Sequence, residues 1–600
     1  MIDNILTLLS ARHAKERPEA PALAAQDEQE RWYDISWREF DRQIAVASRA
    51  LAVLGVEPQH CVATFSANRP ENLVTDFACY RNRAVSVSIY ATSSPEQVAY
   101  IVNDAGCAVL FAGNATQYHF AREAMEHCPC LKQIVVIKPI ELDEDDSSSM
   151  LWDDFMKLGE NASPEISAEV DRRIASATPD DIATLVYTSG TTGEPKGAIL
   201  THSNYDHALE AHRVRLDMLN PSDVSMAFLP LSHIFEKGFT YVCLMVGIKV
   251  AVNRDPRAIQ DTIKEVRPTC MCAVPRFWEK VYTAVHEKIN SMNPVSRSMV
   301  RMALKVGHKR NVDYRRRGLK PPFWLEKSYQ FFDRKVFAML RSAIGIDNPK
   351  IFPTAGAPVS AEIVEFFHSA GLFLMVGYGL SETTATVTCF PMVDYLLGSV
   401  GTPIPEVNVK IGDNDEVLVK SPTVMRGYYN KPEATAEAFT PDGWFRTGDA
   451  GYIRDGALFL TDRIKDLFKT SNGKYIAPQA IETRLGTDKF IEQVAVIGDS
   501  RKFVSALIVP DYEALRKWAD TNKVAYSNTD ELLTAPRVID MMAKRIESLE
   551  KGLAPYERIK RFTLLPHEFT MENGELTNTL KIKRRVINER YASLIEKMYS

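Results

Sequence analysis

Hydrophobic positions recur along the chain with two alternating periods. Short apolar runs rich in β-branched residues predict buried strands, and stretches with apolar residues every three or four positions predict amphipathic helices. The predicted strands are 184–187, 197–201, 225–229, 249–253, 269–274, 350–356 and 372–379, and helices are predicted between several of them, for example at 255–266 and 360–370. Strands that alternate with helices predict an α/β protein with mixed or parallel sheets flanked by helices.

The pattern changes after residue 400. Residues 413–429 and 451–462 have the pattern of hairpins, the second with a turn at Asp455-Gly456. From Lys465 onward, strands and helices follow each other in a smaller α+β arrangement. We therefore expect a large N-terminal domain at 1–461, a hinge at 462–466 and a small mobile α+β C-terminal domain at 467–600.

Length, charge and apolar content narrow the class of protein. A length of 600 residues exceeds one ordinary core and predicts two or more domains. The net charge of −5 argues against nucleic-acid binding. The best candidate for a membrane span, 238–252, is short and contains Lys249, so a buried helix that runs into a strand is expected there. The N-terminal residues show no export signal, so a cytoplasmic location is expected. The oligomeric state stays open.

A glycine-rich loop between two predicted strands is the first candidate site. The stretch "YTSGTTGEPKG" offers hydroxyl groups, glycines that allow close backbone approach, and the charge of Lys196. It differs from a P-loop, because Lys196 is followed by Gly197 and a strand and a helix starts only at about Ser203. Loop amides, hydroxyls and Lys196 would therefore hold phosphate. Taken alone, the stretch also fits a surface turn of small residues.

Polar residues gather in five further stretches. Those after predicted strands matter most, because α/β sheets bind ligands at the carboxyl ends of their strands. The stretches contain His233 and Glu236; Tyr378, Ser381, Glu382 and Thr383; Arg446, Thr447 and Asp449; Arg463, Lys465, Asp466 and Gly473; and Lys581.

The motifs and their order resemble those of the acyl-adenylate-forming ligases, most closely the AMP-forming long-chain acyl-CoA synthetases. "YTSGTTGEPKG" is similar to the phosphate loop of that family, and the later signatures are similar to "LPLSHIFE", "GYGLSET", "WFRTGD", "DRIKDLFKTSNGKYIAP" and "LTNTLKIKRR". The resemblance covers about residues 30–590. It implies that a medium- or long-chain fatty acid reacts with ATP to form acyl-AMP, which then passes to CoA, with Mg²⁺ as cofactor.

The same resemblance assigns roles to individual residues. Lys581, Glu382, Thr188 and His233 are implied to be catalytic, and Glu382 and Thr188 to bind Mg²⁺. Nucleotide binding is implied for Thr188, Ser189, Gly190, Thr191, Thr192, Gly193, Lys196, Gly356, Ala357, Pro358, Tyr378, Gly379, Ser381, Asp449, Arg463 and Gly473. Tyr378 would stack on adenine with Gly356 to Pro358 lining the base, and Asp449 would bind the ribose. The apolar residues that follow His233 would line the acyl tunnel.

Each role has a plainer alternative. Glu382 is also what an exposed helix start carries, His233 fits a satisfied core histidine, and the basic residues around Lys581 fit a solvated chain end. Two other functions stay open. One is an acyl-AMP ligase for another carboxylate or a separate carrier protein, and the other is a non-catalytic, membrane-associated lipid-binding protein. The retention of Glu382, Asp449 and Lys581 favours an enzyme.

Residues 297–341 form a strongly basic stretch. They contain 13 Lys and Arg against 3 Asp and Glu, interleaved with aromatic residues such as Phe323, Trp324, Phe331 and Phe332. One interpretation is a solvated helical insertion. The other is peripheral association with an anionic membrane, where a fatty acid would be collected.

Overall fold

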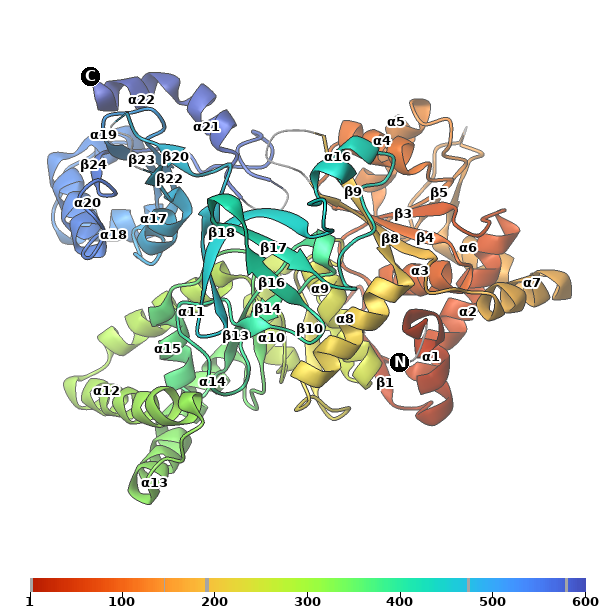
Figure 1. Ribbon diagram of the computed structural model, residues 1–600, viewed down its shortest axis with the longest axis horizontal. Coiled ribbons are helices and arrows are strands. Elements are labelled where there is room, and N and C mark those ends of the chain that lie inside the picture. Colours follow the sequence, from red (N-terminus) through yellow and green to blue (C-terminus); the bar gives the residue numbers. More distant parts are fainter. Residues whose placement is uncertain (1–3, 145, 189–193, 472–474, 578–580) are drawn as a thin grey trace.

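The computed structural model describes the chain except residues 1–3, 145, 189–193, 472–474 and 578–580. Figure 1 shows a large N-terminal part, built from several sheets and their flanking helices, and a smaller C-terminal part at one corner. The expected α/β class with a smaller α+β part is confirmed. Among the described residues, no helix is both long and apolar enough to span a bilayer.

A seven-stranded sheet forms one half of the N-terminal part, in the order β7-β6-β5-β3-β4-β8-β9. All neighbouring strands are parallel except β8 and β9. The strands are β3 (Cys61–Phe65), β4 (Val85–Ile89), β5 (Val109–Ala112), β6 (Gln133–Val136), β7 (Ser149–Leu151), β8 (Ile182–Thr188) and β9 (Lys196–Thr201). The helices around it are α2 (Trp37–Val53), α3 (Pro70–Arg81), α4 (Pro95–Ala105), α5 (Ala115–Glu126), α6 (Trp152–Glu160) and α7 (Pro164–Ala175).

Successive residues of β3 enter different cores, as the two-residue period of a strand requires. Val62 packs into the core that contains Phe77 of α3. Ala63 packs into the core that contains Val98 of α4. Both faces of the sheet are therefore buried, which explains why its strands are apolar runs without polar alternation.

Two further sheets form the other half of the N-terminal part, in the orders β10-β11-β1-β2 and β12-β13-β14-β15. The first contains β1 (Pro21–Gln26), β2 (Trp32–Ser36), β10 (Val224–Ala227) and β11 (Lys249–Val252). The second contains β12 (Phe352–Thr354), β13 (Leu374–Tyr378), β14 (Thr388–Cys389) and β15 (Thr402–Pro403). The strand predicted at 269–274 is wrong, because only isolated bridges of Cys270 and Ala273 connect the two sheets there.

Helices α1 (Ile5–Glu16), α8 (His202–Arg215), α9 (Ile234–Val246) and α10 (Ile259–Val266), with the short η1 (Pro256–Ala258), pack around these sheets. Helix α8 begins at His202 and is capped by Thr201, one residue before the start predicted at about Ser203. The apolar run 238–252 is the predicted helix followed by a strand. Gly247, at φ 88°, ends α9 before β11 begins.

A group of helices projects from the N-terminal part at the lower left of Figure 1. Its helical segments are α11 (Pro275–Ser291), α12 (Pro294–His308), η2 (Lys309–Tyr314), η3 (Arg315–Arg317), α13 (Phe323–Phe332), η4 (Asp333–Phe337), α14 (Ala338–Ile344) and α15 (Ala361–Ser369). Val300, Phe332 and Phe337 belong to a separate small core that holds this group together.

An antiparallel sheet, β16-β17-β18-β19, completes the N-terminal part. Its strands are β16 (Asn408–Ile411), β17 (Glu416–Lys420), β18 (Phe445–Arg454) and β19 (Ala457–Arg463), and the nearby short helices are η5 (Ser381–Thr383), η6 (Asp413–Asp415) and α16 (Pro432–Glu437). The turn at Asp455-Gly456 is confirmed, with both residues at positive φ. The hairpin predicted at 413–429 is wrong, because β17 pairs with the preceding β16.

The C-terminal part has its own sheet and cores. Its strands are β20 (Phe468–Lys469), β21 (Tyr475–Ile476), β22 (Ile491–Ile497), β23 (Val504–Pro510) and β24 (Ile559–Leu564), and its helices are α17 (Pro478–Leu485), α18 (Tyr512–Thr521), α19 (Thr529–Thr534), α20 (Pro536–Leu549), α21 (Arg584–Arg590) and α22 (Ala592–Tyr599). Ile508 packs against Met542 on one face of the sheet, and Leu507 belongs to a second core with Met598.

Candidate functional site

The predicted site residues lie at the ends of strands from three sheets. Strands β12 and β13 run parallel, so their carboxyl ends lie at one edge, where 356–358 and 379–382 follow. Thr188 ends β8 and pairs with Lys196 at the start of β9. Residues 189–193 and Gly473 lie outside the described residues. Their predicted roles therefore stay predictions.

Asp449 is the centre of one group of side chains. It is 7% exposed and accepts a hydrogen bond of 2.6 Å from the hydroxyl of Tyr378. On its other side, Arg463 Nε lies 3.3 Å from Asp449 Oδ1, because β18 and β19 place the two residues opposite each other. Burial, and then the Asp449 carboxylate, raise the pKa of Tyr378 well above its usual value. The Tyr378 hydroxyl is therefore a donor that orients Asp449.

Glu382 is the centre of a second group. The hydroxyl of Tyr428 donates a 2.8 Å hydrogen bond to Glu382 Oε1, and Lys196 Nζ lies 5.2 Å from the centre of the Tyr428 ring. Tyr428 reaches this place because 424–430 lies beside β9, where Tyr429 N donates to Gly197 O. The sequence did not single out Tyr428, although it stands in a polar stretch, "MRGYYN".

The loop after β12 and the turn after β13 are shaped by glycine. Gly356 has φ 92°, which favours glycine, and 356–358 are exposed. At Gly379 a Cβ would lie 1.4 Å from Ala385 O, so only glycine fits there. Ser381, which follows, is buried. The structure thus leaves an open backbone surface at 356–358, at the same sheet edge as the turn that carries Glu382.

His233 caps the first turn of α9. Its Nδ1 accepts a hydrogen bond of 3.2 Å from Phe235 N. Burial, with a smaller contribution from the charge of Lys581, lowers the pKa of His233 to about 4. The imidazole is therefore neutral at physiological pH. Gly238 of the same helix faces Ala385, which places the start of α9 beside the turn that carries Glu382.

Lys581 comes to the site from the C-terminal part. Its backbone N–H donates to Thr577 Oγ1, and its carbonyl accepts from Thr577 N, so the backbone of Lys581 is held beside Thr577. The side chain keeps access to solvent, but the surrounding protein desolvates the ammonium and lowers its pKa, and Arg463 adds to this effect. Asp449, Asp466 and Glu382 act in the opposite direction. Lys581 therefore lies within electrostatic reach of both carboxylate groups.

Ion pairs hold the two parts of the molecule in this arrangement. Arg276 of α11 lies 2.7 Å from Glu492 Oε2 at the start of β22, and Lys280 lies 3.3 Å from Glu492 Oε1. At the predicted hinge, the carboxylate of Asp462 accepts hydrogen bonds from Arg463 N and from Gln479 N of α17. Burial raises the pKa of Asp462 to about 6.

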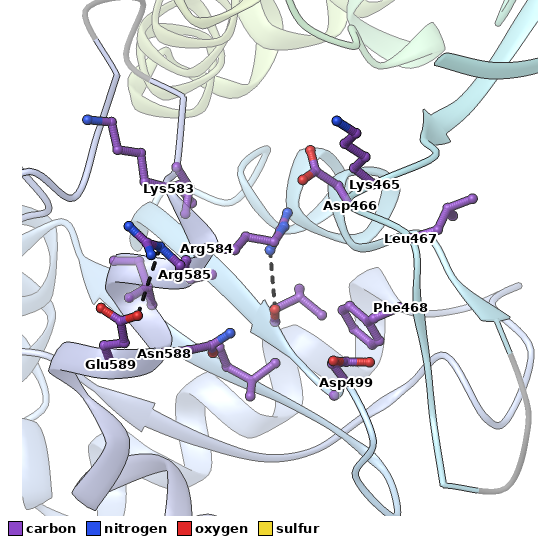
Figure 2. Close-up of a pocket in the computed structure, with 16 residues that line it drawn as sticks. Lys465, Asp466, Leu467, Phe468, Asp499, Lys583, Arg584, Arg585, Asn588 and Glu589 are labelled. Atoms are coloured by element: carbon purple, nitrogen blue, oxygen red, sulfur yellow. Dashed lines mark hydrogen bonds and ion pairs between the residues drawn. The ribbon is translucent and has the colours of Figure 1, made fainter. Parts of the chain in front are cut away.

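A cavity of about 560 Å³ lies on the C-terminal side of the predicted hinge (Figure 2). It is lined by 465–468, 495–499 and residues of 582–589. Arg584 is bound to Glu482 by two 2.7 Å hydrogen bonds, and Figure 2 shows Arg585 directed toward Glu589. Asp466 and Asp499 also line it. Because cations and carboxylates are mixed, the cavity does not select a polyanion.

The two predicted magnesium ligands, Glu382 and Thr188, carry oxygen donors that suit a hard cation. A carboxylate and the Thr188 hydroxyl are oxygen ligands of the kind that Mg²⁺ prefers. The described residues contain no group of three or more His, Cys, Asp or Glu side chains that could enclose a metal ion. A magnesium ion here would therefore take its remaining ligands from water and phosphate oxygens, which is its usual mode of binding.

Comparisons with known proteins cover most of the chain. Residues 10–429 match the profile of the family described as AMP-binding enzyme, and residues 465–600 match the AMP-binding enzyme C-terminal domain. Long-chain-fatty-acid–CoA ligase FadD15 of Mycobacterium bovis is 35% identical over 572 residues, which covers 95% of this chain and 93% of that protein. Human long-chain-fatty-acid–CoA ligase 1 is 32% identical over 570 residues, which covers 90% of this chain and 79% of that protein.

Solved structures show the same fold at low sequence identity. The anthranilate CoA ligase AuaEII in complex with anthranoyl-AMP has a TM-score of 0.72 at 19% identity, covering 99% of this chain and 98% of that one. The A-PCP didomain of carboxylic acid reductase from Segniliparus rugosus with AMP has a TM-score of 0.74 at 21% identity, covering 99% and 82%.

Proposed function

The chain belongs to the AMP-binding enzyme family, and on this premise we propose that it is an AMP-forming fatty-acid–CoA ligase. In the first step, a carboxylate oxygen of the fatty acid bonds to the α-phosphorus of ATP. The bond from that phosphorus to the β-phosphate oxygen breaks, and acyl-AMP and pyrophosphate form. In the second step, the CoA sulfur loses its proton and bonds to the acyl carbonyl carbon. The bond between that carbon and the AMP oxygen breaks.

The observation that carries the proposal is the position of Lys581. It lies within electrostatic reach of Asp449, Arg463 and Glu382, although it comes from the C-terminal part. When carboxylate and α-phosphate approach each other, negative charge gathers between two anions. An ammonium held in a desolvated place stabilises this charge more in the transition state than in the ground state. Lys581 is therefore assigned to the first step.

Asp449 and Glu382 receive different roles. Asp449, oriented by Tyr378, accepts hydrogen bonds from the two ribose hydroxyls, while Arg463 contacts ribose or phosphate. The exposed backbone at 356–358 lines the adenine, with Tyr378 beside it. Glu382 and Thr188 hold Mg²⁺, which when bound neutralises phosphate charge. The loop that Thr188 and Lys196 flank holds the β- and γ-phosphates.

His233 is assigned to the acyl side of the site. With its pKa lowered to about 4, the neutral ring adds no charge beside the incoming carboxylate. The apolar residues of α9 that follow His233 line the acyl tunnel. Each buried CH₂ contributes about 0.8 kcal/mol, so affinity rises with chain length until the tunnel ends.

The two steps need different groups at one acyl centre, so the C-terminal part has to present two faces in turn. We assign this motion to a hinge at 462–466 between an N-terminal domain at 1–461 and a C-terminal domain at 467–600. We also place the chain in the cytoplasm, in peripheral contact with an anionic membrane. The surplus of cations in 297–341 supports this placement.

ATP–pyrophosphate exchange, measured with saturated acids of increasing length, tests the proposal. Exchange should depend on the fatty acid, and kcat/KM should rise about fourfold per CH₂ before it levels off, as 0.8 kcal/mol per CH₂ requires. A preference for acetate or for aromatic acids would exclude a long-chain substrate. Exchange without any added acid, or no exchange with any acid, would exclude the activity.

A further inference from the structure

Residues 294–337 form a helical arm that extends away from the sheets. The arm consists of α12, η2, η3, α13 and η4, and Figure 1 shows α13 at its far end, remote from the C-terminal part. On its inner side, Val300, Tyr329 and Phe332 are buried in a common core. This packing fixes the rotation of each helix about its axis. The side chains on the outer face are therefore exposed to solvent.

Large apolar side chains are exposed on this arm far more than elsewhere. Among the described residues, 17 large hydrophobic side chains are exposed, and seven of them lie in the arm, between 295 and 331. Phe323 is 77% exposed, Trp324 57% and Phe331 54%. Single exposed apolar residues are normal on a protein surface, but a concentration of aromatic ones marks an interaction site.

The exposed aromatic residues share one face of α13 with cations. Trp324, Lys327, Phe331 and Lys335 follow each other at spacings of three and four residues, which place side chains on one helix face. Phe323 and Arg334 belong to the same exposed face. On α12, Val295, Met299 and Met302 repeat the spacing, with Lys305 and Lys309 following them. Both helices thus present a face that is apolar and cationic.

Of the three acidic side chains of the arm, Glu326 and Asp333 are bound by arginines, and the exposed Asp313 lies 3.7 Å from His308. Glu326 binds Arg310 at 2.8 Å and lies 3.6 Å from Arg315, and Asp333 binds Arg341 at 2.6 Å. Eight exposed cations have no carboxylate partner among the described residues: Arg301, Lys305, Lys309, Arg317, Lys320, Lys327, Arg334 and Lys335.

Two of these cations lie against the exposed rings. Lys309 Nζ is 5.3 Å from the centre of the Trp324 ring, and Lys327 Nζ is 5.5 Å from that of Phe323. The first contact joins the faces of α12 and α13 into one surface. An interfacial helix has the same arrangement, with aromatic rings at the level of the headgroups and Lys or Arg beside them.

We propose that the outer face of this arm docks on an anionic lipid bilayer. Phe323, Trp324 and Phe331 enter the headgroup region, and the eight unpaired cations contact lipid phosphates. The benefit of docking, access to fatty acids that partition into the bilayer, rests on the proposed function. Binding to the bilayer itself requires no catalysis. Single-stranded RNA could stack on the rings and contact the cations, but it would leave the exposed apolar side chains Val295, Met299 and Met302 in water. The observations therefore favour the bilayer.

Co-sedimentation of the full chain with vesicles tests the assignment. The chain should sediment with phosphatidylcholine–phosphatidylglycerol vesicles, weakly or not at all with phosphatidylcholine vesicles, and less as salt rises. The variant K320Q/K327Q/R334Q/K335Q should bind more weakly by about fivefold for each cation removed. The variant F323S/W324S/F331S should also lose binding. Hydrogen exchange at 319–335 should slow when anionic vesicles are added.

Two matched controls locate the effect on the arm. K517Q/K523Q/K551Q/K560Q removes four exposed lysines of the C-terminal part, and V53S/V214S removes two exposed apolar side chains on α2 and α8. Both should bind vesicles like the parent chain. The assignment would be overturned by equal binding to neutral vesicles or by unchanged binding of both arm variants. It would also be overturned if the chain were retained on RNA and this retention needed the aromatic residues.

Ligation of octanoate, an acid that dissolves in water, separates this inference from the proposed function. Both arm variants should ligate octanoate at the parental rate, because the arm contributes no residue to the candidate site. A parent chain that binds anionic vesicles but forms no acyl-CoA would contradict the proposed function alone. A parent chain that forms acyl-CoA but ignores the vesicles would contradict the docking alone.

Discussion

Two carboxylates of the candidate site have the same kind of partner. Tyr378 donates to Asp449, and Tyr428 donates to Glu382. Burial, and then the adjacent carboxylate, raise the pKa of both phenols, so each remains a donor at any physiological pH. A neutral hydroxyl must donate to an ionised carboxylate, which only accepts, so it holds the carboxylate in one orientation without adding charge. In both cases the carboxylate keeps acceptor capacity for a ligand.

The variant Tyr428→Phe tests this arrangement at Glu382. Loss of one hydrogen bond to a charged group typically costs about 1.5 kcal/mol or more, so kcat/KM for ATP should fall about tenfold. The Mg²⁺ concentration needed for half-maximal exchange should rise. Tyr429→Phe is the control, because Tyr429 is the next tyrosine and is not bonded to Glu382. An unchanged Mg²⁺ dependence in Tyr428→Phe would show that Tyr428 does not position a magnesium ligand.

Lys581 is expected to serve only the first step. Lys581→Ala should lose ATP–pyrophosphate exchange by roughly 10²–10³, the usual effect of removing one preorganised electrostatic contact. It should still convert supplied acyl-AMP and CoA into acyl-CoA. Lys583→Ala, two positions away, should impair neither step. Near-parental exchange in a folded Lys581→Ala protein would reject the assignment, as would an equal loss in both steps.

Glu236 makes stability depend on pH. Burial raises its pKa from 4.5 to about 8, so between these values the folded chain holds a proton that the unfolded chain has lost. Stability should therefore fall as pH rises through this window, by up to about 1.4 kcal/mol per pH unit. Glu236→Gln should remove this slope in thermal unfolding, and Glu437→Gln, at an exposed position, should keep it. The same slope in Glu236→Gln would assign it to another group.

At the scale of elements, the proposed hinge at 462–466 runs from the end of β19 in the N-terminal part toward β20 in the C-terminal part. Asp462 accepts backbone hydrogen bonds from Arg463 beside it and from Gln479 across the hinge. Lys465, in the following turn, is exposed. Asp462, held by backbone hydrogen bonds, and the exposed Lys465 lie only three residues apart. This spacing suits rotation about a short segment more than bending over a long one.

The variant Lys465→Pro tests the hinge. Proline restricts φ at 465 and constrains Ile464, so rotation should become slower. The present arrangement, with Lys581 at the site, should be less affected. Formation of acyl-CoA from supplied acyl-AMP should therefore slow more than ATP–pyrophosphate exchange. Lys469→Ala is a control outside the hinge. An equal loss in both steps would give 462–466 a different role.

Elements that carry a strong local signal could be predicted from the sequence, and those that depend on distant partners could not. The run 238–252 showed its helix and strand because most residues of both are buried. Residues 269–274 have the same apolar character, but the neighbouring sheets meet them only at isolated bridges. At 413–429 the turn signals were present. The partner of β17 is β16, which lies before this stretch, so residues 413–429 alone could not reveal the pairing.

The candidate site follows the same rule. Asp449, Arg463 and Glu382 stood in recognisable motifs, and the structure places them near Lys581. Tyr428 was missed because it reaches Glu382 only when 424–430 lies beside β9. That strand lies more than 200 residues earlier in the chain. Gly379 was named for a motif. Its physical reason, the carbonyl of Ala385 at 1.4 Å from a Cβ, required coordinates.

At the scale of the whole molecule, the C-terminal part carries two cores of its own, and few side chains attach it to the rest. The described attachments include the pairs of Glu492 with Arg276 and Lys280, all of which keep some solvent access. Such pairs stabilise an orientation weakly and are screened by salt. Separate cores and weak attachments support the proposed motion of the C-terminal part as one body.

The projecting arm changes how substrate concentration should be expressed. A chain held at a bilayer by the arm meets its acid within a surface, so encounter depends on molecules per lipid and not per litre. Suppose that acid-free anionic vesicles are added while the total amount of a long-chain acid stays constant. The number of acid molecules per lipid then falls, so the ligation rate should fall. The ligation rate of the F323S/W324S/F331S variant should instead depend on the concentration of acid dissolved in water. Because that concentration is small, the rate should be low even before vesicles are added. Ligation of octanoate, which spends little time in lipid, should be nearly independent of the added vesicles. Rates that follow bulk concentration alone for palmitate and octanoate would show that the acid reaches the site from water.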